Sequence, residues 1–134
     1  MPEDFIGEEI GEEPLPVVFV LSDARGKTAV GVVEAAADQF EDGAIVVKQL
    51  GNVNNVEMVC DYLDKNREED TPTAVFHTIA DKNLRRDIRR ERDSRGIPSV
   101  DLLGPSITVI ASLTGSEPAS ISGHRAEISV QELA

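Results

Sequence analysis

The chain has 134 residues and a formal net charge of −12, from 25 acidic and 13 basic side chains. At this length, folding buries roughly two-thirds of the surface of the unfolded chain, so one domain can form a core without disulfides or metals. The negative charge argues against nucleic acid and anionic membranes as partners, because both attract cationic surfaces. A single cysteine and the lack of any C-x-x-C pair exclude an internal disulfide and a zinc site of that type. We therefore expect a cytoplasmic protein that holds no metal.

Residues 1–16 form an acidic segment that carries six carboxylate side chains and ends in Pro-Leu-Pro. Such a composition buries too little apolar surface to order itself, so we expect a disordered leader. The segment lacks the basic start of a signal peptide, and no apolar stretch of the chain approaches the ~18 residues that span a membrane.

Short apolar runs and helical periods alternate after the leader. Short, mostly apolar runs predict buried strands at 17–21 and 44–48. Between them, apolar residues at spacings of three and four predict a helix over about 27–40, which Asp42-Gly43 ends. The inward face of this helix is expected to hold Val30, Val33, Ala37 and Phe40.

The next two helices have recognisable caps. Asn54 is expected to begin the second helix, in a variant of the capping box. The inward face of that helix is expected to hold Val56, Val59, Cys60 and Leu63. A third strand at 73–77 leads to a helix that Asp81 caps, with Leu84 and Ile88 facing the core.

A short fourth strand at 99–102 precedes the last helix, which Gly104-Pro105 opens. The apolar period of this helix predicts a core-facing stripe of Ile107, Ile110 and Leu113. The pattern dissolves after Gly115. The α/β domain is therefore expected to span residues 17–115, and residues 116–134 to form a polar tail.

Four strands, each followed by a helix, predict an α/β fold, a three-layer sandwich in which a four-stranded parallel sheet has helices on both faces. We expect the strand order 2-1-3-4, because the first and third strands are the longest apolar runs and belong in the centre. Ligands of such folds bind at the carboxyl ends of the strands. Here these ends are Ser22-Asp23, Leu50 to Asn52, His77-Thr78 and Leu103-Gly104.

The stretch LSDARGKTA, residues 21–29, has the Gly-Lys-Thr of a phosphate-binding P-loop. A P-loop also needs a glycine five residues before Gly26, and Leu21 stands there, so we expect no nucleotide at Lys27. The helix start that remains is a candidate site for one phosphate or carboxylate. Its candidate residues are Ser22, Asp23, Gly26, Lys27 and Thr28. The alternative is that Asp23 and Thr28 only cap and shape the turn.

His77 and Asp101 are candidate residues at the carboxyl edge of the sheet, where an imidazole could serve acid–base chemistry. The alternatives are an ordinary hydrogen-bonded histidine and an aspartate that caps the turn after its strand. The residues give no complete catalytic set.

Residues 82–95 contain seven of the 13 basic side chains. Such a concentration predicts a docking surface for an acidic partner. The docking candidates are Arg85, Arg86, Arg89 and Arg90. The alternative is a solvated helix with internal ion pairs at helical spacing. These pairs are Arg89–Asp93, Glu91–Arg95 and Asp87–Arg90.

Three blocks, VLSDARGKTAVGVVEAAADQF, AVFHTIADKNLR and GIPSVDLLGP, together resemble the N-terminal half of a known family. Its members are bifunctional serine/threonine kinases and phosphorylases that regulate pyruvate, phosphate dikinase and phosphoenolpyruvate synthase. The resemblance covers about residues 17–124. The family's first motif is approximately S-D-x-T-G-x-T-A-E, and this chain matches it at Ser22, Asp23, Gly26, Thr28 and Ala29. Arg25 and Val30 replace the usual threonine and glutamate, and Lys27 falls at a variable position.

The resemblance implies an enzyme that uses ADP to phosphorylate a threonine or serine of the dikinase or synthase, and inorganic phosphate to remove that group. It assigns ADP to a C-terminal half, through a loop of the form G-x-S-R-x-x-K-T that has no match here. We therefore expect no cofactor in this domain, and a polar tail that leads to a missing kinase domain.

On this interpretation the domain is inactive alone and either completes the active site or recognises the dikinase. Its expected partners are the dikinase or synthase, its own C-terminal kinase domain and, as a further candidate, a second copy of itself. The competing interpretation is a stand-alone α/β module that binds a small anion at Gly26 to Thr28.

Overall fold

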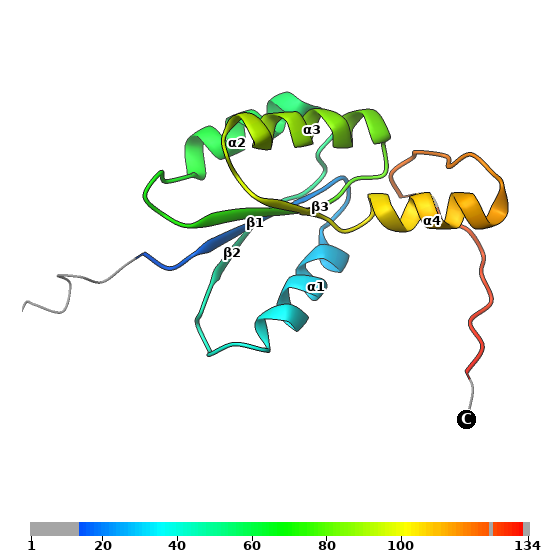
Figure 1. Cartoon of the computed structure of the whole chain (residues 1–134), viewed down its shortest axis with the longest axis horizontal. Helices are drawn as coiled ribbons and strands as arrows, with labels where there is room; N and C mark the ends of the chain where they lie inside the picture. Colours follow the sequence, from blue (N-terminus) through cyan, green and yellow to red (C-terminus); the bar gives the residue numbers. More distant parts are fainter. Residues whose placement is uncertain (1–13, 124, 133–134) are drawn as a thin grey trace, which may run out of the picture.

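The structure is a computed structural model that describes residues 14–123 and 125–132. One sheet of four parallel strands has the order β2-β1-β3-β4, and four helices accompany it (Figure 1). The expected α/β class and strand order are confirmed. In chain order the elements are β1 (Val17–Ser22), α1 (Lys27–Ala37), β2 (Val46–Leu50), α2 (Val56–Asn66), β3 (Thr73–Thr78), α3 (Lys82–Ser94), β4 (Ser99–Asp101) and α4 (Gly104–Thr114).

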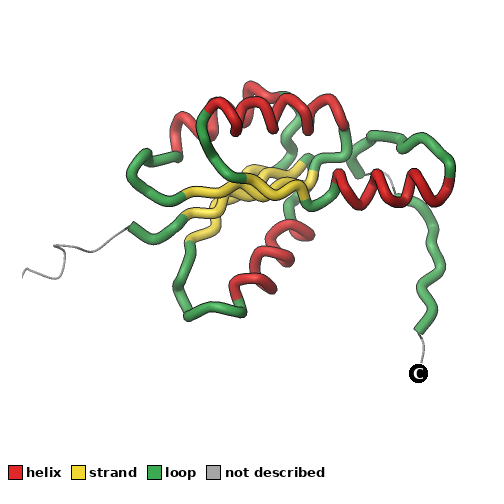
Figure 2. The backbone as a smooth tube through the Cα atoms, in the orientation of Figure 1, coloured by secondary structure: helices red, strands yellow, loops and turns green. Residues whose placement is uncertain are grey.

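Helices cover the two faces of the sheet unequally (Figure 2). On one face, α2 and α3 lie side by side and enclose the larger core cluster, which is Phe19, Leu21, Val53, Val59, Leu63, Val75, Ile79, Ile88 and Ile97. On the other face, α1 alone packs on the smaller cluster, which is Val18, Val20, Ala29 and Val33. α4 starts after β4 and extends beyond the end of the sheet, so it adds no residue to either cluster of the described chain (Figure 1).

The strand register brings the candidate residues to one edge. Leu21 of β1 aligns with Leu50 on one side and with His77 on the other, and His77 aligns in turn with Asp101 of β4. Because all four strands are parallel, their carboxyl ends lie together. The edge that sequence reasoning selected is therefore a single continuous region of the molecule.

The structure corrects the expected first helix and second strand. α1 ends at Ala37, because the amides of Gln39 and Phe40 donate to carbonyl oxygens three residues back and tighten the chain into turns. Phe40 is consequently 71% exposed, so its expected place in the core is wrong. β2 begins at Val46, two residues later than expected, where its ladder with β1 begins.

The cap of α2 is also corrected, whereas the cap of α3 is confirmed. Asn55, not Asn54, caps α2, because its side-chain oxygen is the one that accepts from the Met58 amide, at 3.0 Å. Asn54 instead accepts from the side-chain amide of Asn55. Asp81 caps α3 as expected, by accepting from the amides two and three residues further on, at 2.8 and 3.3 Å.

The core stripe expected for α4 is wrong except at its first member. Ile107 is half-buried, but Ile110 is 58% exposed and Leu113 is 80% exposed. The physical reason is that α4 does not turn back over the sheet, so no described element covers its outer face.

The expected leader lies outside the described residues up to position 13. Residues 116–123 and 125–132 contain no helix or strand. Of the helices that the structure describes, none has the length and apolar composition needed to cross a membrane.

Candidate functional site

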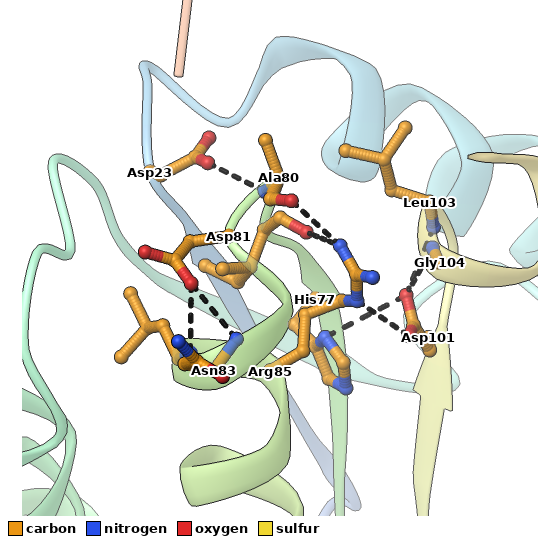
Figure 3. Close-up of polar contacts among 11 residues, drawn as sticks. Asp23, His77, Ala80, Asp81, Asn83, Arg85, Asp101, Leu103 and Gly104 are labelled. Carbon is orange, nitrogen blue, oxygen red and sulfur yellow. Dashed lines mark hydrogen bonds and ion pairs between the residues drawn. The ribbon is translucent and has the colours of Figure 1, made fainter. Parts of the chain in front are cut away.

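Asp23 joins the carboxyl ends of β1 and β3. Its amide donates to the Thr78 carbonyl at 3.3 Å, and its Oδ2 accepts from the Ala80 amide at 2.8 Å (Figure 3). The carboxylate therefore fixes the loop after β3 and does not cap α1. The alternative that Asp23 caps its own turn is wrong, because its carboxylate accepts instead from an amide in the loop after β3, and no side chain caps α1.

α1 begins without a side-chain cap. Gly26 immediately precedes the helix. Its φ of 85° is in the left-handed region, which glycine adopts without strain. The first intrahelical bond runs from the Val30 amide to the Gly26 carbonyl at 2.9 Å. The amides of Lys27, Thr28 and Ala29 come before that bond. Among residues 14–123 and 125–132, no side chain caps them, and this includes the hydroxyl of Thr28. These three amides lie at the positive end of the helix and can donate hydrogen bonds to an anion.

A pocket of about 550 Å³ lies at this helix start. All five predicted anion-binding residues line it, namely Ser22, Asp23, Gly26, Lys27 and Thr28. Arg25 and Arg125 also line it, so three basic side chains meet around one hollow in a chain of net charge −12. Guanidinium, ammonium and helix-start amides are the groups that bind phosphate or carboxylate.

Sequence reasoning missed Arg125, which belongs to the tail after α4. Ser122 Oγ donates to the Asp23 carbonyl at 2.7 Å, and this contact across 99 residues holds the tail beside the pocket. The tail has no apolar periodicity and no motif, so its sequence carried no signal that would have located Arg125.

His77 and Asp101 do meet, as their neighbouring strand ends predicted. His77 is 3% exposed, and its Nδ1 lies 3.9 Å from Asp101 Oδ1, too far for a hydrogen bond (Figure 3). Burial lowers the pKa of His77 below its ordinary value near 6.5, against the opposing attraction of Asp101. The imidazole is therefore held neutral, with Nδ1 unpaired among the described residues.

Asp101 caps the turn into α4, which was the alternative left open for it. Its Oδ1 accepts from the amides of Leu103 and Gly104 at 3.0 and 2.7 Å (Figure 3). A Cβ on Gly104 would overlap the Asp101 carboxylate and approach Arg85 Nε to 3.0 Å. A side chain here would displace the Asp101 carboxylate from the two amides that it accepts from, so the β4–α4 junction favours glycine.

Arg85 is placed differently from the other docking candidates. Its side chain is 13% exposed, and its Nη1 donates to the carbonyl oxygens of Ile79 and Ala80 at 2.9 and 2.8 Å. Its Nε lies 3.7 Å from Asp101 Oδ2 (Figure 3). Arg85 thus ties the ends of β3 and β4 together. It is turned into the domain, and docking surface remains only at the other three arginines.

Arg86, Arg89 and Arg90 are exposed on the outer side of α3. Of the expected internal pairs, Glu91–Arg95 forms at 2.8 Å, and Arg95 also pairs with Asp64 of α2 at 2.8 Å. The other two expected pairs are absent from the described residues. Their aspartates lie instead beside Arg86 and Arg92, at 3.3 and 2.9 Å. Arg89 and Arg90 therefore have no ion-pair partner in the described part of the chain.

No group of three or more His, Cys, Asp or Glu side chains suited to a metal ion occurs among residues 14–123 and 125–132. The arrangement as a whole offers an anion pocket, a rigid strand-end cluster and a basic helix face.

A sequence profile of the family described as kinase/pyrophosphorylase matches residues 18–133. The chain is 33% identical to the putative pyruvate, phosphate dikinase regulatory protein 2 of Syntrophomonas wolfei, over 78% of this chain and 37% of that protein. It is 34% identical to the putative pyruvate, phosphate dikinase regulatory protein of Halalkalibacterium halodurans, over 82% and 40% of the two chains. The chain thus spans about two-fifths of the length of these relatives. Because the profile covers most of the sequence, the chain belongs to the kinase/pyrophosphorylase family.

Proposed function

We propose that this chain is the dikinase-recognising part of a cytoplasmic regulator. The whole regulator would use ADP to phosphorylate, and inorganic phosphate to dephosphorylate, a threonine or serine of pyruvate, phosphate dikinase or phosphoenolpyruvate synthase. The observation that carries the proposal is the match to relatives named as dikinase regulatory proteins. The chain matches less than half of each relative, so the catalytic steps are assigned to the part that it does not match.

The outer face of α3 supports recognition rather than catalysis. Arg86, Arg89 and Arg90 are exposed, and the last two have no ion-pair partner among the described residues. A protein of net charge −12 repels an acidic partner at most points of its surface, so a basic face gives the orientation in which the two can approach.

Association rates test this docking proposal. The variant Arg86→Glu/Arg90→Glu should associate with a pyruvate, phosphate dikinase more slowly than the wild type at low salt. The difference should shrink at high salt, because about 0.1 M salt screens charges over roughly 10 Å. The matched control, Lys48→Glu/Lys65→Glu, makes the same change in net charge on β2 and α2, outside the outer face of α3, and should have a much smaller effect. Equal slowing by both pairs would contradict docking at α3.

The nucleotide is expected to bind elsewhere than Lys27, because Leu21 stands at the position of the P-loop glycine. Calorimetry of this chain with ADP and with ATP should show no saturable binding at about millimolar ligand. Saturable binding that Lys27→Ala abolishes would contradict this part of the proposal.

The second candidate function is a stand-alone module that binds a small anion, and the basic pocket at the start of α1 favours it. Titration with inorganic phosphate should shift the amide NMR signals of Gly26 to Thr28, and Arg125→Ala should weaken the binding. Lys65→Ala, an exposed lysine far from this pocket in the chain, is the control and should leave the phosphate affinity unchanged. Phosphate binding together with no dikinase binding would favour the module over the regulator.

A further inference from the structure

β2 is an outer strand of the sheet, and one side of its backbone is unpaired in the described part of the chain (Figure 1). The Val46 amide donates to the Pro16 carbonyl at 2.9 Å, on the side where β1 lies. Because successive peptide groups of a strand point to opposite sides, the backbone groups of Val47 and Gln49 point away from β1. No described residue bonds to them there. This edge can therefore accept a further strand.

A hollow of about 270 Å³ lies beside this edge, and its floor is apolar. Val33, Ile45 and Val47 line it, and Val47 is on the α1 face of the sheet because it aligns with Val18 of the smaller core cluster. Phe40 also lines the hollow and is 71% exposed. Pockets for small molecules usually measure roughly 300–1,000 Å³. The hollow therefore suits one apolar side chain of a partner better than a whole cofactor.

The charged residues that line the hollow are all acidic, namely Glu34, Asp38, Glu41 and Asp42. All four are exposed. None of them takes part in the ion pairs that the described residues form with one another. The pocket at the start of α1, in contrast, is lined by three basic side chains. The two hollows of the domain thus favour ligands of opposite charge.

We propose that the edge of β2 binds an extended, basic segment of another polypeptide. The segment pairs with β2 as a fifth strand and places an apolar side chain in the hollow, with a basic side chain on each side of it. Side chains of a strand return to the same face every two residues, so the pattern basic-x-apolar-x-basic presents all three to the α1 face. Hydrogen bonds to the free backbone groups supply affinity, and the hollow and its carboxylates supply specificity.

Charge selects a foreign strand over the other occupants. Residues 1–13, which lie outside the described range, carry six carboxylate side chains and no basic one, so the acidic rim repels them. The dense basic cluster of a second copy lies on a helix, α3, which cannot add to a strand edge. A basic foreign strand is attracted both by the rim and by the net charge of −12. Docking at α3 requires an acidic partner, so the two proposals can fail separately.

NMR titration of the full 134-residue chain with the blocked peptide Lys-Thr-Ile-Thr-Lys tests the proposal. The amide signals of Val47 and Gln49 should shift saturably. Two matched peptides separate the contributions, because Glu-Thr-Ile-Thr-Glu reverses the charge and Lys-Thr-Ser-Thr-Lys removes the apolar side chain. Each should bind at least roughly fivefold more weakly.

Variants of the protein test the edge and the rim separately. Val47→Pro removes an outward amide and is compatible with an outer strand, so it should abolish peptide binding while circular dichroism stays unchanged. Asp38→Lys/Asp42→Lys should weaken binding at least roughly fivefold. The matched control is Asp61→Lys/Asp93→Lys, at exposed carboxylates of α2 and α3, and should have little effect.

Four outcomes would overturn the proposal. They are no saturable shift at the edge of β2, equal binding of the serine or glutamate peptide, equal weakening by the two charge-reversal pairs, and unchanged affinity of a folded Val47→Pro. Signals of β2 that shift with protein concentration alone would assign the edge to a second copy and would overturn it as well.

Discussion

α3 and α4 have opposite compositions and opposite relations to the core. Residues 82–95, which include α3, hold seven basic side chains, yet Ile88 of α3 is 1% exposed and lies in the larger core cluster. α4 has no charge, yet its apolar residues face solvent. The more polar helix is the better integrated one. A helix is therefore built into this domain by the arrangement of its side chains and by the surface available to it, not by its mean hydropathy.

Polar contacts strengthen the integration of α3. Asp81 caps its first turn, Arg85 binds carbonyl oxygens at the end of β3, and Arg95 bridges to Asp64 of α2. In the described part of the chain, the polar contact that ties α4 to the rest of the domain is the Asp101 cap at its start, whereas the bonds at its end lie within the helix and its last turn. α3 is thus held at both ends, whereas α4 is held at one.

The largest expected effect is a difference in stability when one isoleucine is replaced by alanine in each of the two helices. Ile88→Ala should lower the free energy of unfolding by about 2–5 kcal/mol, because it leaves a cavity in a packed core. Ile110→Ala should lower it by less than about 0.5 kcal/mol, because the side chain is already exposed. Urea unfolding, followed by circular dichroism in dilute protein, measures both. Similar losses for the two variants would mean that α4 packs on the domain as closely as α3.

A smaller effect is expected from the cap of α3. Asp81→Ala removes the acceptor of two first-turn amides and should cost about 0.5–2 kcal/mol of unfolding free energy. Asp87→Ala, within the same helix, removes only a contact with the exposed Arg86 and should cost less than about 0.5 kcal/mol. The comparison by urea unfolding separates capping from loss of a surface carboxylate. Equal costs would show that the cap adds no stability.

The smallest effect concerns His77, which lies where α3 and the start of α4 meet. Asp101 lies beside it at the end of β4, and the positive charges of Arg85, Arg92 and Arg89 of α3 also disfavour its protonation. The folded state lowers the pKa of His77 from its ordinary value near 6.5, chiefly through burial. Just below that pH, the unfolded chain therefore binds more protons than the folded chain. Stability should fall as the pH drops below about 6.5 and be recovered above it.

His77→Gln provides the control for this pH dependence. The variant lacks the titrating group, so its unfolding free energy should vary less with pH between about 5 and 7 than that of the wild type. Carboxylates titrate in both proteins and cancel in the difference. Identical pH profiles would mean that the folded state does not hold His77 neutral.

The arrangement of the sheet could be predicted from the sequence, because each strand is a short apolar run and the longest runs belong in the centre. The meeting of His77 and Asp101 follows from that order, since their strands are neighbours. The inward position of Arg85 also had a signal. Arg85 lies next to Leu84 and three residues before Ile88, on the core-facing side of α3. Grouping it with the other arginines of the helix overlooked this position.

Two features of the site and fold could not be predicted. The period of Ile107, Ile110 and Leu113 shows that these residues share one side of a helix, but periodicity does not reveal whether a surface exists to cover that side. Arg125 reaches the pocket through a single side-chain contact from an irregular tail. Such contacts depend on the three-dimensional path of the chain and leave no pattern in its sequence.

The contrast between a fully integrated α3 and a peripheral α4 is tested most directly by hydrogen exchange of the full chain, measured in one dilute sample. We expect the amides of α3 around Ile88 to exchange only through unfolding of the whole domain, and those of α4 after its first turn to exchange much faster through local opening. Equal protection of the two helices in this sample would contradict this account.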